Sequence, residues 1–163
     1  MPVKPPLIAQ ERLDTCAIAC FRMILAFHGR VISEPELIRS VAMEAGGLDI
    51  EELARLGRNL GLDAKIQELD VAGIAGLIRR GIFPIVYLNR IHLDRRFPVN
   101  RRIALRLFLP HAVIPVQVSP HYVVFHDPLS NKPRRVSKRK FEAAQRDLRS
   151  WCVVCRSSAR SRA

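Results

Sequence analysis

The chain has 163 residues and a formal net charge of +12 at neutral pH. This length is enough to bury one hydrophobic core, and no apolar stretch approaches the roughly 20 residues that a membrane-spanning helix needs. The N-terminus contains Pro2, Pro5 and Pro6 and no long apolar core, which excludes a secretory signal and favours a cytoplasmic location. We expect one soluble domain over residues 1–156 and a disordered basic tail at 157–163.

The first expected element is a helix that opens at Cys16. Asp14 and Thr15 are good N-cap residues, and apolar side chains follow until Gly29 ends the segment. Cys16 then lies in the first helical turn, where unpaired backbone N–H groups and the helix dipole favour a thiolate over a thiol. The plain alternative is that Cys16 is a small buried hydrophobic residue, as many free cysteines are.

Gln10 precedes this helix and is a candidate for oxyanion binding. A thiolate that attacks a carbonyl generates a tetrahedral oxyanion, which a side-chain amide and the backbone N–H of the nucleophile can stabilise. A glutamine just upstream of the helix can reach that point. Without Cys16 beside it, Gln10 would be read as an ordinary solvated side chain.

Helices and strands alternate through the middle of the chain. Ser33 with Glu36 predicts a capped helix that runs to about residue 45, and Asp49 with Glu52 predicts a second that ends near residue 61. Helices followed by an antiparallel sheet indicate an α+β fold. The other expected elements are strands at 63–69, 83–88 and 151–154, a helix at 71–80, and a helix capped by Ser137 that runs to residue 148.

A β-hairpin is expected in the C-terminal half. Residues 111–118 are apolar and mostly β-branched, a Ser-Pro turn follows, and residues 121–126 form the second strand. His111 begins the first strand and Asp127 directly follows the second, so the hairpin brings these side chains together. The carboxylate would orient the imidazole and stabilise its charged form. The other histidines are less well placed for this contact: His28, His92, His121 and His126.

Several segments occur together in an order that is typical of one family. They are Gln10, Asp14-Thr15-Cys16-Ala17-Ile18-Ala19-Cys20, Met23-Ile24-Leu25-Ala26-Phe27-His28-Gly29, Phe83-Pro84-Ile85-Val86-Tyr87-Leu88, His111-Ala112-Val113 and Asp127-Pro128-Leu129. In these segments the chain resembles the bacteriocin-processing, double-glycine leader peptidases and their stand-alone relatives, over roughly residues 7–155.

The resemblance implies a papain-like cysteine peptidase fold, with an N-terminal helical half packed on a C-terminal antiparallel sheet. It also implies roles for four residues: Gln10 as the oxyanion-hole donor, Cys16 as the nucleophile, His111 as the general base and acid, and Asp127 as the residue that orients the imidazole. The expected reaction is cleavage of a peptide or leader peptide without a cofactor. Transfer of the acyl group to an amine would use the same residues and stays open.

A second hypothesis is a catalytically silent module that keeps this fold and binds a peptide, an acidic partner or nucleic acid. Thr15 and Ala17 support it, because the family usually has aspartate directly before the cysteine and glycine directly after it. A Cβ atom at position 17 could crowd a peptide in the cleft. The basic C-terminal half would supply the binding surface.

Charge divides the chain into two halves. Residues 1–88 carry 10 basic and 11 acidic side chains, whereas residues 89–163 carry 17 basic and 4 acidic ones. This excess predicts attraction to an acidic partner or an anionic membrane surface, although an arginine-rich solvated face would look the same. Nucleic acid ranks lower because the basic runs lack interleaved aromatic residues.

A basic insert at residues 89–110 combines arginines with apolar side chains. It directly precedes His111, so we expect a lid that borders the cleft. A partner-docking loop and a membrane-surface element are the alternatives.

The four cysteines also permit a structural zinc site as a hypothesis. The spacing of Cys152 and Cys155 argues against it, because an odd separation along a strand sends the two sulfurs to opposite faces. A disulfide between them is disfavoured in a cytoplasmic setting, and Cys20 fits core packing. We therefore expect no metal, and no pattern in the sequence indicates an oligomeric state.

Overall fold

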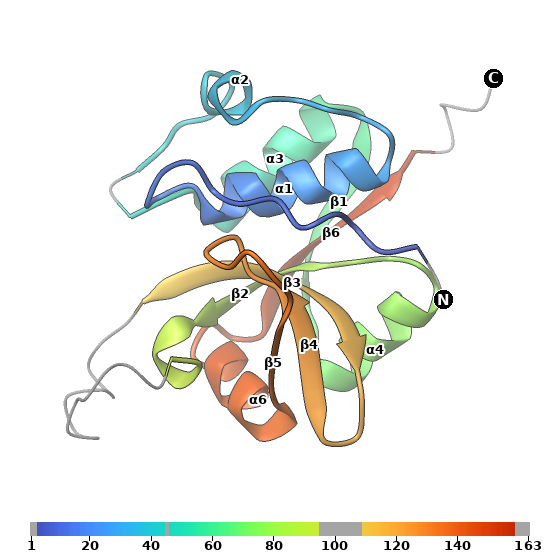
Figure 1. Ribbon diagram of the computed structural model, residues 1–163. Helices are drawn as coiled ribbons and strands as arrows, with labels where there is room; N and C mark the ends of the chain where they lie inside the picture. Colours follow the sequence, from blue (N-terminus) through green and yellow to red (C-terminus); the bar gives the residue numbers. More distant parts are fainter. Residues whose placement is uncertain (1–2, 45, 95–108, 159–163) are drawn as a thin grey trace.

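The computed structural model describes residues 3–44, 46–94 and 109–158 (Figure 1). A six-stranded sheet runs through the molecule in the strand order β1-β6-β2-β3-β4-β5, and every neighbouring pair is antiparallel. The expected α+β class is confirmed. The strands are β1 (Leu62–Glu68), β2 (Ile85–Asn89), β3 (Pro110–Val118), β4 (Tyr122–His126), β5 (Arg134–Ser137) and β6 (Trp151–Ser157).

Helices cover both faces of this sheet (Figure 1). Neighbouring residues of a strand point to opposite faces, so β2 sends Ile85 into one core and Val86 into the other. The core around Ile85 packs against α1 (Cys16–Phe27), α2 (Glu34–Ile38) and α3 (Ile50–Asn59). The core around Val86 packs against α4 (Val71–Arg79) and α6 (Lys138–Arg146).

Helix α1 begins at Cys16, as predicted, but its first turn lacks the expected side-chain cap. Thr15 occupies the N-cap position, yet its hydroxyl donates to the Arg12 carbonyl (3.0 Å) and accepts from the Arg12 N–H (3.1 Å). Among the described residues, no side chain therefore caps the first turn, and the helix dipole and the first-turn N–H groups can stabilise negative charge on the Cys16 sulfur. The helix is followed by Gly29, whose φ of +77° favours glycine.

Helix α2 is much shorter than predicted. Ser33 caps it by accepting the Glu36 N–H, but it ends at Ile38. The Ala42 N–H, which a longer helix would give to the Ile38 carbonyl, donates to the Glu52 carboxylate instead. The α-helical pattern is already lost at Ser40 and Val41, whose N–H groups donate to the Leu37 and Ile38 carbonyls three residues back. The caps of α3 and α4 are regular, with Asp49 and Asp70 accepting backbone N–H groups of their first turns.

The predicted hairpin is formed by β3 and β4. Ile114 pairs with His126, and a bulge lies between Pro115 and Gln117. β5, which was not predicted, adds to the far side of β4 with Phe125 opposite Arg134. Helix α1 packs on β3, so the start of the helix and the start of β3 meet at one edge of the core.

The insert expected at 89–110 lies largely outside the described residues, as does most of the tail. Its two ends are joined, because Asn89 Oδ1 accepts the Leu109 N–H (3.1 Å) and the Arg90 N–H donates to the Leu109 carbonyl (2.9 Å). Short 3₁₀ helix η1 (Arg90–His92) follows β2 at this point. In the described part of the chain, no helix combines the length and the apolar character that crossing a membrane would require.

Candidate active site

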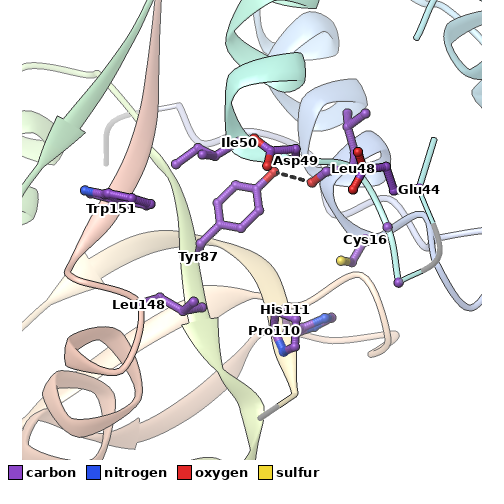
Figure 2. Close-up of a pocket in the computed structure, with 12 residues that line it drawn as sticks. Cys16, Glu44, Leu48, Asp49, Ile50, Tyr87, Pro110, His111, Leu148 and Trp151 are labelled. Atoms are coloured by element: carbon purple, nitrogen blue, oxygen red, sulfur yellow. Dashed lines mark hydrogen bonds between the residues drawn. The ribbon is translucent and has the colours of Figure 1, made fainter. Parts of the chain in front are cut away.

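Cys16 lies at the first position of α1 and faces the start of β3 across a cavity (Figure 2). Its side chain is half-buried. Burial opposes ionisation, but the hydrogen bond and charge of His111, together with the backbone N–H groups of Ala112 and Ala17, lower the pKa of the Cys16 thiol below its ordinary value. The N-terminus of the helix and the neighbouring imidazole thus act in the same direction.

His111 and Asp127 are in direct contact, as the hairpin predicted. His111 Nε2 donates to Asp127 Oδ1 at 2.7 Å, and both side chains are buried. Burial alone would lower the pKa of His111, but the hydrogen bonds and charges of Asp127 and Cys16 raise it to about 9. The imidazole is therefore charged at neutral pH, and its second ring nitrogen remains for proton exchange with the sulfur.

The Asp127 carboxylate is held by more than the histidine. Its Oδ1 also accepts the Leu129 N–H (3.0 Å), and its Oδ2 accepts from Arg134 Nη1 (2.6 Å). Burial raises the pKa of Asp127, but His111, the Leu129 N–H and Arg134 outweigh it and hold the pKa well below the usual range. Asp127 is thus an anion throughout the range in which His111 titrates.

Gln10 is fixed beside the first turn of α1. Its backbone N–H donates to the Pro128 carbonyl (3.0 Å), which ties the N-terminal segment to the loop after Asp127. The side-chain Nε2 donates to the carbonyls of Arg12 (2.7 Å) and Leu13 (3.2 Å). The side-chain oxygen is buried without a hydrogen-bond partner among the described residues.

The cavity in front of Cys16 has a volume of about 270 Å³. Figure 2 shows Tyr87, Leu148 and Trp151 on one side and Cys16 and Glu44 on the other. Ala17 does not line this cavity; its methyl group is buried in the core under α1, so it does not crowd the cleft. The remaining wall consists of Gly46, Gly47, Leu48, Asp49, Ile50, Pro110 and His111.

The turn at Glu44–Gly47 brings backbone close to the start of α1. The two residues exchange backbone hydrogen bonds of 3.2 and 3.1 Å. Gly47 has a φ of +122°, and a Cβ atom there would lie 3.2 Å from the Asp14 carbonyl oxygen. Glycine therefore suits this position for two reasons, and at Gly46 and Gly47 no side chain projects from the cleft wall.

The other histidines do not join this group. His92 pairs with Asp147 at 2.8 Å, His121 is exposed at the hairpin turn, and burial lowers the pKa of His28. His126 is buried, and burial together with the Lys4 charge lowers its pKa.

The three further cysteines are buried and free. Burial raises the pKa of Cys152 and of Cys155 to about 12, and burial raises that of Cys20 well above its ordinary value. Cys152 and Cys155 belong to the cores on opposite faces of the sheet, as their spacing predicted. No group of three or more potential metal ligands occurs among the described residues.

Arg134 is the site neighbour that sequence reasoning missed. It belongs to the basic C-terminal half, for which the sequence predicts attraction to an acidic partner or an anionic membrane surface, whereas its guanidinium contacts Asp127. The Ala112 N–H was missed as well, because a backbone group leaves no signature in the sequence. Only the pairing of β5 with β4, which places Arg134 opposite Phe125, identifies Arg134 as a neighbour of Asp127. β5 was not predicted from the sequence, so this pairing could not be used.

Comparison with solved structures shows the fold. A C39-like peptidase from Bacillus anthracis has a TM-score of 0.72 at 16% identity, covering 94% of this chain and 96% of that one. The peptidase domain of Streptococcus ComA, a bi-functional ABC transporter involved in a quorum-sensing pathway, has a TM-score of 0.68 at 14% identity, covering 94% and 99%. A double-glycine motif protease from an AMS/PCAT transporter, in complex with the leader peptide, has a TM-score of 0.66 at 15% identity, covering 94% and 91%.

Comparison with sequence families gives the same class of protein. The search of curated proteins found no significant match. The model of the Peptidase C39 family matches residues 4–93, which include Gln10 and Cys16 and end before His111. Since this match spans more than half of the sequence, the chain belongs to the Peptidase C39 family and is a cysteine peptidase.

Proposed function

We propose that the chain cleaves a peptide or leader peptide with Cys16 as nucleophile, His111 as general base and acid, Asp127 as the residue that orients the imidazole, and Gln10 as an oxyanion-hole donor. The observation that carries the proposal is the buried arrangement in which one imidazole contacts Asp127 at 2.7 Å and lowers the pKa of Cys16. A thiolate beside an imidazolium is the state that a nucleophilic cysteine needs at neutral pH.

The reaction begins from the pair in which the proton of Cys16 already lies on His111, and the thiolate attacks the carbonyl carbon of the peptide. The imidazolium then gives this proton to the departing amine, and a thioester to Cys16 remains. His111 next takes a proton from water, which attacks the thioester and releases the acid product. If an amine replaces water in the last step, the same residues transfer the acyl group.

The oxyanion of the tetrahedral intermediate would lie in front of the first turn of α1. We assign it the Cys16 N–H, which belongs to the unpaired end of the helix, and one N–H of Gln10. The Gln10 bond to the Leu13 carbonyl is the longer of its two, at 3.2 Å against 2.7 Å, so we assign that N–H to the oxyanion. Replacing Gln10 by alanine is then expected to lower kcat by about 10²-fold or more.

The cleft suits an extended peptide. Its walls combine apolar side chains such as Tyr87 and Trp151 with the main chain of the Glu44–Gly47 turn. A solved protease of the same fold is bound to a leader peptide, and we infer a peptide substrate for this chain as well. We further propose that residues 1–156 act together as one peptidase domain.

The test is the pH dependence of Cys16 alkylation by iodoacetamide, read by peptide mass spectrometry. Wild type is expected to react well below pH 8, and His111→Ala is expected to react roughly 10-fold more slowly at pH 6, because an ordinary thiol with a pKa near 8.5 is then almost entirely protonated. His121→Ala is the matched control, since His121 is exposed at the hairpin turn. If His111→Ala reacts like wild type at pH 6, the proposed pair does not exist.

A further inference from the structure

Asp127 is bracketed by two cationic side chains. His111 contacts Oδ1 at 2.7 Å and Arg134 contacts Oδ2 at 2.6 Å, and the Leu129 N–H completes the shell of Oδ1 at 3.0 Å. The Asp127 side chain is only 1% exposed. Each oxygen therefore has its own partner, and rotation of the carboxylate would break contacts on both sides at once.

Arg134 is itself fixed on three sides. Its guanidinium lies over the buried Phe125 ring, 5.6 Å from the ring centre, because Arg134 pairs with Phe125 across β4 and β5. Its Nη2 donates to Asp94 Oδ1 (3.0 Å) and to the Leu93 carbonyl (3.3 Å). Arg90 contacts the other oxygen of Asp94 at 2.7 Å. The planar fork of arginine can make such contacts in fixed directions, which a flexible ammonium group cannot do.

The contacts form a continuous series of alternating charges. It runs from Arg90 through Asp94, Arg134 and Asp127 to His111, with Cys16 at its end. The series connects the residues that follow β2 with the nucleophile on α1. Only its last three members take part in the reaction proposed above.

We propose that Arg134 is a positioning residue for the reaction: it holds the Asp127 carboxylate in the orientation that keeps Oδ1 on His111, and Asp94 holds Arg134. This inference rests on the proposed function, because it assigns to Arg134 a role that acts through Asp127. Arg134 contacts neither Cys16 nor the lining of the cavity among the described residues. A guanidinium in this place fixes the geometry of the carboxylate and leaves proton transfer to the histidine.

Electrostatics alone predicts the opposite effect of removing Arg134. The groups that face His111 are Asp127 and Cys16, and the Arg134 charge lies behind Asp127. As a mere cation, Arg134 would disfavour a second cation on His111, so its removal would leave Cys16 as reactive as before or more so. If Arg134 positions Asp127, its removal makes Cys16 less reactive. The direction of the change therefore separates the two roles.

The experiment compares Arg134→Gln, Arg134→Lys and Asp127→Asn with wild type. Arg135→Gln is the matched control, since it removes the same charge from the next residue of β5, where Arg135 is exposed and stacks on Tyr122. The readout is the rate of Cys16 alkylation by iodoacetamide from pH 5 to pH 9, with circular dichroism as the check of folding. These measurements need no knowledge of the natural substrate.

We expect Arg134→Gln to lower the alkylation rate at pH 7.5 by roughly 3-fold or more, and its pH profile to move towards that of an ordinary thiol. Arg134→Lys is expected to recover part of the loss, because lysine keeps the charge but not the fork. Arg135→Gln is expected to match wild type. Asp127→Asn is expected to lose at least as much as Arg134→Gln.

Two results would overturn the inference, and they differ in meaning. If Arg134→Gln reacts like wild type or faster while Asp127→Asn is impaired, Arg134 does not position Asp127 and the proposed function stands. If Asp127→Asn also reacts like wild type, the proposed function itself fails. Should Arg134→Gln not fold, Asp94→Asn decides, because it releases the far side of the guanidinium: a reduced rate supports positioning, and an unchanged rate contradicts it.

Discussion

Replacing Asp127 by asparagine removes the carboxylate charge that contacts His111 and keeps the size of the side chain. In the wild-type protein, burial lowers the pKa of His111, but Asp127 and Cys16 together raise it from 6.5 to about 9. A return from about 9 to 6.5 lowers the ratio of imidazolium to imidazole by roughly 300-fold, because a change of one in the pKa is a tenfold change in that ratio. At pH 7.5, which lies between these two values, the fraction of imidazolium falls from nearly all to about one tenth.

We therefore expect the rate of Cys16 alkylation at pH 7.5 to fall by up to roughly 10-fold in Asp127→Asn, since Cys16 supplies part of the raised pKa and is retained. The rate should recover as the pH approaches 8.5, where an ordinary thiol ionises. Iodoacetamide labelling between pH 5 and pH 9, read by peptide mass spectrometry, measures both effects.

Asp63→Asn is the matched control, because it removes a carboxylate that pairs with Lys65 on β1 at 3.3 Å and lies outside the cavity lining. Circular dichroism establishes that each variant is folded. A folded Asp127→Asn protein whose Cys16 reacts at the wild-type rate at pH 7.5 would refute the reasoning, since the carboxylate would then not support the ion pair.

Four further predictions concern the stability of the fold, the reactivity of the four thiols and the ionisation of Asp127. Glu34→Ala is expected to lower the free energy of unfolding by about 2 kcal/mol in urea titrations, because the buried carboxylate accepts the Glu11 N–H at 3.2 Å and lies 3.6 Å from Arg22. No loss would mean that the contact between Arg22 and Glu11 alone is enough to hold this part of the fold. Gly57→Ala is expected to lower the free energy of unfolding by about 1–3 kcal/mol, because its Cβ would lie 2.7 Å from the Ala64 Cβ. Gly76→Ala on α4 meets only the end of the Arg79 side chain and is expected to raise the free energy of unfolding by about 0.5 kcal/mol. Equal thermal shifts in both variants would contradict this. A disulfide reagent such as DTNB is expected to titrate Cys16 rapidly in the native protein at pH 7 and the other three cysteines only after unfolding, because those thiols are buried with raised pKa values. The pKa of Asp127 is depressed in the folded state, so its ionisation stabilises the fold above its ordinary pKa of 3.8, and this stabilisation is lost as the pH falls further. The difference in unfolding free energy between wild type and Asp127→Asn should therefore shrink between pH 5 and pH 3. A difference that grows in this range would disprove the assignment.

The parts of the site that could be predicted depend on local signals. Cys16 follows residues with N-cap preference, and the helix does begin there, although Thr15 bonds back to Arg12 instead of capping it. His111 and Asp127 flank two apolar segments joined by a short turn, and pairing of those segments brings the two side chains into contact. The start of α1 and the contact of His111 with Asp127 both follow from short loops and from strongly periodic apolar segments, which can be seen in the sequence.

The parts that could not be predicted depend on tertiary contacts. Ser33 indicates where α2 begins, but no local signal marks its end, where the Ser40 and Val41 N–H groups bond three residues back and the Ala42 N–H donates to the Glu52 carboxylate. β5 is a short edge strand rich in basic residues, and a charged edge strand resembles a surface loop in the sequence. Arg134 and Arg135 are adjacent arginines, and only the register against Phe125 decides which of them reaches Asp127.

The position of β6 between β1 and β2 has a consequence for how quickly the molecule can fold. Among the described strands, β1 pairs with β6 alone, so Glu68 must meet Trp151 and Leu62 must meet Ser157, which lie far apart in the chain. Contacts of such large sequence separation slow folding, because the entropy of closing a long loop is lost before the pairing is gained. Cys16 and His111 also come from distant segments joined through the same core. We expect the thiol to become reactive late in folding, together with the closing of the sheet, so that a partly folded chain is not yet a peptidase.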